Sequence, residues 1–116
     1  MQIKYYNNNI LQTTILVDYK NYQVSIQNHT DDIIHLAFGV NKHPTFTDYE
    51  NFLESRCFPR SRANCKELLR QLDIPYYDPI AICEKTKGKM AEDNSYMEIN
   101  WDIPYNKDEA DFELEV

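Results

Sequence analysis

The chain has 116 residues, 42% of them hydrophobic and 13% aromatic, which is enough for the core of one domain and too few for two. Its net charge of −7 argues against direct binding to nucleic acid, because phosphate neutralisation requires positive charge. The sequence has neither an apolar N-terminal run nor a stretch of membrane-spanning length, so we expect a cytoplasmic protein that does not contact membranes.

The charges and the cysteines are unevenly placed along the chain. Residues 56–70 carry five basic side chains against one acid, whereas residues 102–116 carry six carboxylates against one lysine. We therefore expect a molecule that is basic in its middle and acidic at its end. The three cysteines, Cys57, Cys65 and Cys83, lack the spacing of a metal site or a disulfide framework and are predicted to be reduced thiols.

The first 40 residues have the pattern of a β-meander. Residues 3–6 and 10–17 are rich in β-branched and aromatic residues and flank a run of three asparagines, which favours a hairpin turn. In residues 22–27 apolar and polar side chains alternate strictly, as in a strand with one face in water. The apolar residues 33–38, which end at a glycine, are predicted to form one more strand.

Two helices are predicted in the middle of the chain. Thr47 and Glu50 fit the capping box, so the first helix is predicted to run from Thr47 until Pro59 disfavours helical geometry. The second is predicted from about residue 62 to 72, with Ser61 as its N-cap. Its core-facing side chains follow the helical spacing and are Cys65, Leu68, Leu69 and Leu72.

A third helix and a returning strand complete the predicted fold. Asp78 followed by Pro79 predicts a helix start, and the helix is expected to stop at Gly88. Residues 97–103 alternate between apolar and polar side chains, so they are predicted to form a strand with Trp101 in the core.

Together these elements predict an α+β fold. An antiparallel sheet, made of the N-terminal meander plus the C-terminal strand, is expected to have about three helices packed on one face. Residues 1–103 are predicted to form this single domain and residues 104–116 an acidic C-terminal tail. The tail is either a solvated end or, because residues 112–116 alternate, a strand that docks on a partner.

The best candidate for a site is a cluster of arginines at the predicted start of the second helix. Arg56, Arg60 and Arg62 lie close to Ser61, where free backbone N–H groups and guanidinium groups favour an anion. These four residues are the predicted partner- or anion-binding site, for a phosphorylated or acidic segment of a partner. The alternative is that the arginines pair with carboxylates and staple the loops; the candidates are Asp73, Asp78, Glu92 and Asp93.

No catalytic, metal or cofactor site is predicted. His29, His35 and His43 are spread over a turn, a strand and a loop, whereas metal ligands must converge. A nucleophilic pair of Cys57 with His43 lacks an oxyanion loop and an orienting residue.

The arginine-rich run, the leucine-rich helix after it and a glycine and aspartate farther on form one pattern. In order and spacing they resemble the N-terminal region that precedes the kinase domain in HipA-like proteins of toxin–antitoxin systems. The positions that carry the resemblance are Arg56, Pro59, Ser61, Arg62, Gly88 and Asp93. The similarity spans residues 3–99.

The resemblance implies a free-standing counterpart of that leading domain. Such a protein is an antitoxin-like, non-enzymatic accessory or regulatory protein that binds directly to a HipA-like kinase partner. Kinase activity is not implied, because the chain has two glycines and no glycine-rich phosphate loop. The alternative is a phage or mobile-element inhibitor whose acidic surface mimics nucleic acid and blocks a DNA-handling or defence protein, although the basic middle interrupts such a surface.

Overall fold

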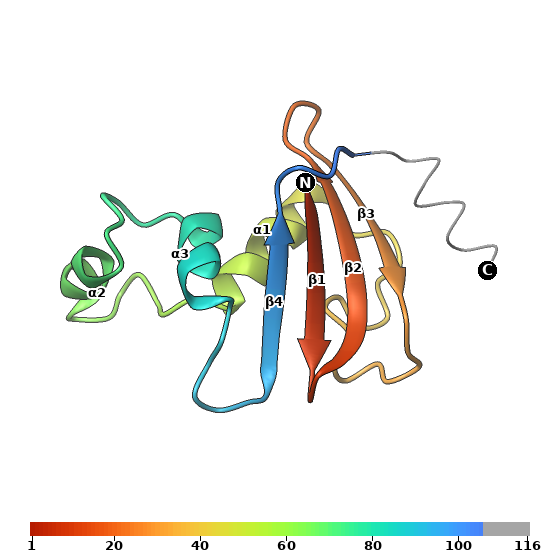
Figure 1. Ribbon diagram of the computed structural model, residues 1–116, viewed down its shortest axis with the longest axis horizontal. Helices are drawn as coiled ribbons and strands as arrows, with labels where there is room; N and C mark the ends of the chain where they lie inside the picture. Colours follow the sequence, from red (N-terminus) through yellow and green to blue (C-terminus); the bar gives the residue numbers. More distant parts are fainter. Residues whose placement is uncertain (106–116) are drawn as a thin grey trace.

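The computed structural model describes residues 1–105 and has an α+β fold, in which one four-stranded antiparallel sheet combines with three helices (Figure 1). The strands are β1 (Gln2–Asn7), β2 (Ile10–Asp18), β3 (Gln23–Asn28) and β4 (Ser95–Asn100). The helices are α1 (Phe46–Ser55), α2 (Cys65–Gln71) and α3 (Pro79–Thr86). The strand order is β3-β2-β1-β4, so the N-terminal meander and the C-terminal strand form one sheet and the predicted fold class is confirmed.

The first hairpin forms where the asparagine run predicts it. Asn8 and Asn9 have φ angles of 52° and 64°, in the left-handed region that asparagine tolerates better than most residues. The turn brings β2 back beside β1, and β4 pairs with the other edge of β1. Ile3 therefore lies opposite Ile15 on one side and Ile99 on the other, which centres the sheet on β1.

The sheet buries the face that the helices cover. Its fully or nearly buried apolar side chains on this face are Ile3, Tyr5, Ile15, Val17 and Met97. The Tyr5 ring meets the Phe52 ring of α1 edge to face, with the ring centroids 5.1 Å apart. Burial of this alternating stripe against a helix supplies the main hydrophobic stabilisation of the fold.

Helix α1 covers the sheet, but its N-cap lies two residues before the predicted capping threonine, Thr47. Its N-cap is Thr45, whose hydroxyl accepts a hydrogen bond from the Asp48 backbone N–H, while the Asp48 carboxylate accepts one from the Thr45 N–H. This reciprocal box displaces the predicted pair of Thr47 and Glu50. The buried residues of α1 are Tyr49, Phe52 and Leu53.

The three helices lie at different distances from the sheet (Figure 1). Helix α1 crosses behind it, α3 lies beside α1 next to β4, and α2 lies farthest from the strands. Leu69 of α2 and Ile74 after it belong to the same cluster of buried residues as the sheet. No helix within residues 1–105 is both long and apolar enough to cross a membrane.

The second helix is shorter than predicted. Backbone hydrogen bonds from Arg62 to Pro59 and from Cys65 to Arg62 form successive turns, so α2 begins at Cys65 and ends at Gln71. Of the predicted core stripe only Leu69 is fully buried; Cys65 and Leu72 are partly buried against the core. Helix α3 starts at Pro79 as predicted and ends at Thr86, before Lys87 and Gly88 in left-handed backbone.

Residues 33–38 do not form the predicted strand. The Asp32 carbonyl accepts hydrogen bonds from the backbone N–H groups of His35 and Leu36, which coils the segment into turns. Its apolar side chains are divided between core and solvent as a result. Phe38 packs against Phe52, whereas Ile34 is 87% exposed.

The predicted burial of Trp101 is also wrong. Strand β4 ends at Asn100, whose side-chain oxygen accepts a hydrogen bond from the Asp102 N–H and turns the chain. Trp101 is 49% exposed and stacks on Tyr19. Of the predicted tail, 104–116, the structure describes the first two residues; the rest, including the alternating residues 112–116, lies outside the described residues.

Candidate functional site

The four predicted site residues lie at the end of α1 and in the loop after it, but in two different environments. Arg56 is the C-cap of α1 and is buried, with 7% of its surface exposed. Arg60, Ser61 and Arg62 are exposed in the turns that precede α2. The structure therefore separates one arginine of the predicted cluster from the other two.

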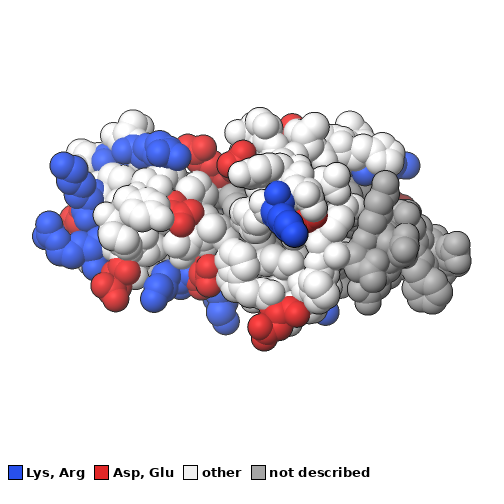
Figure 2. All heavy atoms as spheres, turned by 90° about the horizontal axis from the view of Figure 1, so that it is seen from above, with Lys and Arg blue, Asp and Glu red and all other residues white. Residues whose placement is uncertain are grey.

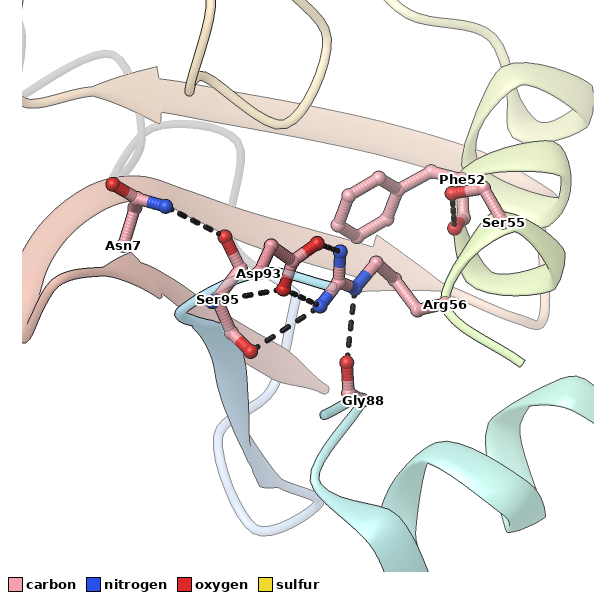
Figure 3. Close-up of polar contacts among 7 residues, drawn as sticks. All are labelled: Asn7, Phe52, Ser55, Arg56, Gly88, Asp93 and Ser95. Carbon is pink, nitrogen blue, oxygen red and sulfur yellow. Dashed lines mark hydrogen bonds and ion pairs between the residues drawn. The ribbon is translucent and has the colours of Figure 1, made fainter. Parts of the chain in front are cut away.

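Arg56 joins the end of α1 to the segment between α3 and β4, more than 30 residues later in the sequence (Figure 3). Its Nε donates to the Gly88 carbonyl at 2.9 Å, and its two terminal nitrogens donate to the Asp93 carboxylate at 2.8 and 3.0 Å. One of these nitrogens also donates to the Ser95 carbonyl at 3.2 Å. Such a planar, two-pronged pairing is specific to arginine.

The carboxylate of Asp93 is fixed from two sides. The hydrogen bond from Arg56 lowers the pKa of Asp93, and a hydrogen bond from the Ser95 backbone N–H at 3.0 Å lowers it further. The Ser95 hydroxyl accepts a hydrogen bond from the Asn7 amide, which links the network to the end of β1. For Arg56 and Asp93 the arrangement is the stapling alternative, and it leaves Arg56 too buried to touch a partner.

Arg60 is held in a different way, on the surface. Its Nε donates to the Glu54 carboxylate at 3.2 Å, and Glu54 is not among the carboxylates expected for a staple. Its guanidinium group lies 4.4 Å from the centroid of the Tyr77 ring, a cation–π contact. Burial raises the pKa of Tyr77 to about 12, and the Tyr77 hydroxyl donates to the Phe58 carbonyl.

Ser61 is not an N-cap, because α2 begins at Cys65 with Asn64 as its cap. The predicted anion site at a helix start is therefore not formed around Ser61. Arg62 is exposed, and its side chain makes no hydrogen bond or ion pair with another residue of the part of the chain that the structure describes. Of the three arginines, Arg62 has the guanidinium group that is available to a partner.

Arg62 lines a hollow of about 300 Å³ between α3, the link after Gly88 and the loop of residues 57–64, which we call the arginine loop. Its apolar lining includes Phe58, Leu68, Ile82 and Met90. Three basic residues line it as well, namely the buried Arg56 and the exposed Arg62 and Lys89, together with one acid, Glu92. This set, which we call the arginine hollow, combines an apolar lining with excess positive charge. Sequence reasoning placed Arg62 here but missed Lys89 and Met90, since they belong to a link without periodicity.

The basic side chains gather toward the end of the molecule that carries α2. Figure 2 shows Lys and Arg concentrated there, with Asp and Glu side chains fewer and scattered. Lys66 and Arg70 extend this basic region along α2, where Arg70 pairs with Glu67. The basic middle of the sequence therefore corresponds to a basic region at the α2 end of the folded molecule.

The three histidines, His29, His35 and His43, are not gathered into a metal-binding group in the part of the chain that the structure describes. Within residues 1–105 no group of three or more His, Cys, Asp or Glu side chains is placed to hold a metal ion. His43 precedes the start of α1 and Cys57 follows its end, so the ten-residue helix separates them by roughly 15 Å. They form no nucleophilic pair.

Cys57 and Cys83 lie side by side in the core. Their sulfur atoms are 3.8 Å apart, and both thiols are free and buried. The hydrogen bond with Cys57 and burial raise the pKa of Cys83, which keeps that thiol protonated. The pair therefore acts as core packing.

Of the positions that carry the resemblance to HipA-like proteins, three form contacts in the Arg56 network, namely Arg56, Gly88 and Asp93. Arg56 comes from the arginine-rich run, and Gly88 and Asp93 come from the later part of the pattern. Comparison with family models, with curated proteins and with solved structures finds no match to this chain.

Proposed function

We propose that this protein is a non-enzymatic, antitoxin-like accessory or regulatory protein that acts in the cytoplasm by binding directly to a HipA-like kinase. The proposal rests on the sequence resemblance and on the surface around the arginine loop. The kinase would be the enzyme of the pair, and this chain would supply a recognition surface.

The observation that carries the proposal is the contact of Arg56 with Gly88 and Asp93. In sequence these positions are more than 30 residues apart, and the resemblance needs all of them. Their contact gives a physical reason for their occurrence together, because each stabilises the conformation of the other segment. This contact supports the proposal of a shared fold with the leading domain.

The arginine hollow supports a mode of binding. An apolar lining beside Arg62 and Lys89 fits a partner side chain that is apolar at its tip and flanked by a carboxylate or phosphate. Arg56 contributes indirectly, since it fixes the end of the link that contains Lys89 and Met90.

The first experiment is capture of partners from the native cell with the tagged full chain, followed by mass spectrometry. A HipA-like kinase among the specific partners is the expected result, and the neighbouring open reading frames should include its gene. Recovery of a nuclease or another DNA-handling protein instead would favour the inhibitor alternative. Turnover of a substrate by the purified protein alone would overturn the proposal.

The second experiment tests the site. The double variant Arg62→Glu, Lys89→Glu should lower affinity for the captured kinase by at least about tenfold, because two favourable charges become repulsive. Its melting temperature should stay within about 2 °C of the wild type, since both side chains are exposed. Lys42→Glu is the matched control, because Lys42 is exposed and precedes the opposite end of α1. An equal loss of affinity in the control would mean that the arginine hollow is not the surface that binds the kinase.

A further inference from the structure

A cluster of aromatic rings lies at the end of the sheet where β2 turns into β3. Tyr19 lies at its centre, with its ring centroid 5.5 Å from that of Phe46 and 5.7 Å from that of Trp101. Tyr22 extends the cluster, since its ring centroid lies 5.3 Å from that of Phe46. We call Tyr19, Tyr22, Phe46 and Trp101 the aromatic platform. Tyr49 supports it from the core, and its hydroxyl is hydrogen-bonded to that of Tyr19.

The platform is exposed to an extent that core packing does not explain. Tyr22 is 69% exposed, Trp101 49% and Tyr19 37%. Tyr and Trp are the residues that most often dominate the energetics of protein interfaces. The platform lies at the N-terminal end of α1, whereas the arginine hollow lies beyond the C-terminal end, so the two surfaces are separate.

The backbone at Tyr22 is strained. Its φ angle is 53°, in the left-handed region, where a turn ordinarily has glycine or asparagine. An exposed tyrosine gains little from burial there, yet its ring rests on Phe46. Strain that stability does not repay is a feature of functional positions.

The segments that form the platform carry carboxylates. Glu50 is one helical turn after Phe46. Asp18 and Asp102 are the sequence neighbours of Tyr19 and Trp101, and the Asp18 carboxylate accepts hydrogen bonds from Lys20 and Asn21. Burial raises the pKa of Tyr19, the hydrogen bond with Tyr49 lowers it, and the negative charges of Asp78, Glu50 and Glu84 raise it. Against these five acids stands Lys20, at the tip of the turn.

We propose that the aromatic platform binds an arginine-bearing segment of a partner protein. A guanidinium group stacks on aromatic faces and pairs with carboxylates, and the platform offers both within one surface. Lysine fits less well, because its ammonium group cannot stack or pair in two-pronged fashion. The charge complementarity is opposite in sign to that of the arginine hollow, so the two surfaces select different segments.

The experiment uses Trp101, the single tryptophan of the chain, as an intrinsic reporter within the platform. The full-length protein is titrated with a heptapeptide that alternates glycine and arginine, and with matched peptides in which citrulline, lysine or glutamate replaces arginine. We expect a saturable change of Trp101 fluorescence with the arginine peptide. The citrulline peptide keeps the shape of the arginine side chain and lacks its charge, so its affinity should be lower by at least about tenfold. An equal response to the citrulline or glutamate peptide would overturn the proposal.

Two variants distinguish the platform from general attraction to an acidic protein. Tyr22→Asn removes one ring and suits the left-handed backbone, so affinity should fall by about three- to tenfold while the melting temperature is kept or raised. Glu50→Gln should weaken binding at least about threefold, whereas Asp31→Asn, the same charge change in the loop after β3, should not. Unchanged peptide binding by Tyr22→Asn would also overturn the proposal. So would a protein that sediments as a dimer without peptide and, as a dimer, shows no fluorescence response to the peptide.

Discussion

A single buried arginine explains why the middle of this chain and its last strand depend on each other. Arg56 donates to the Gly88 and Ser95 carbonyls and pairs with Asp93, so one side chain fixes the end of α1, the exit from α3 and the start of β4. Its exposed fraction of 7% means that the loss of any of these contacts leaves a buried polar group unpaired.

Arg56→Lys is expected to lower the free energy of unfolding by about 1 to 3 kcal/mol, although the charge is kept. An ammonium group on a flexible stem cannot pair with both Asp93 oxygens in one plane and reach the Gly88 carbonyl as well. Urea unfolding at neutral pH measures the change.

Arg60→Lys is the matched control for this substitution, because its pairing with Glu54 and Tyr77 is exposed to solvent. We expect a change within about 0.5 kcal/mol. Equal losses for Arg56→Lys and Arg60→Lys would mean that the network around Arg56 does not stabilise the fold.

At the scale of elements, the periodic parts of the sequence predict the structure well. The alternation in β3 and the proline at the first position of α3 are satisfied locally, so the chain adopts the predicted elements. Residues 33–38 are different, because Thr30 and Asp32 bond the backbone and turn it before a strand can pair. Apolar composition alone does not reveal this competition.

The start of a helix is the least predictable feature of this chain. Thr45 and Thr47 each head a possible capping box, and the choice of Thr45 places Phe46 in the first turn, where it meets Tyr19 and Tyr22. That contact is tertiary and invisible in the local pattern. The same holds for the site: the sequence indicates the arginines, but the hydrogen bonds that hold Arg56 in the core come from a segment more than 30 residues away.

The junction of α3 and β4 provides a prediction at this scale. Gly88 has a φ angle of 64°, and a Cβ atom there would approach the buried Met97 methyl group to 2.7 Å. Gly88→Ala should therefore lower the free energy of unfolding by about 1 kcal/mol through backbone strain and by up to about 1 kcal/mol more through displacement of Met97. Thermal or urea unfolding measures the loss.

Gly39→Ala separates the two contributions to this loss. Gly39 has a similar φ angle of 55°, but its nearest neighbour would be the Ile33 carbonyl oxygen at an ordinary 3.8 Å. The alanine variant should show the backbone cost alone. A loss at Gly39 as large as that at Gly88 would mean that the packing of Met97 adds nothing.

For the whole molecule, the question is whether the distant α2 unfolds together with the sheet. Buried residues from α2, α1, α3 and the strands belong to one hydrophobic cluster. Elements that share one continuous core are expected to unfold cooperatively, and a single domain of residues 1–103 predicts the same behaviour.

Two signals report on the two ends of the molecule during urea unfolding. Trp101 fluorescence follows the end of the sheet, and circular dichroism at 222 nm follows the helices. The two curves should have the same midpoint and the same slope, because a single cluster of buried side chains joins both ends. If the helical signal falls at a lower urea concentration than the fluorescence, α2 and the arginine loop form a separate, weaker unit. In that case the arginine hollow would be assembled only when a partner is bound, since α2 contributes Leu68 to its lining.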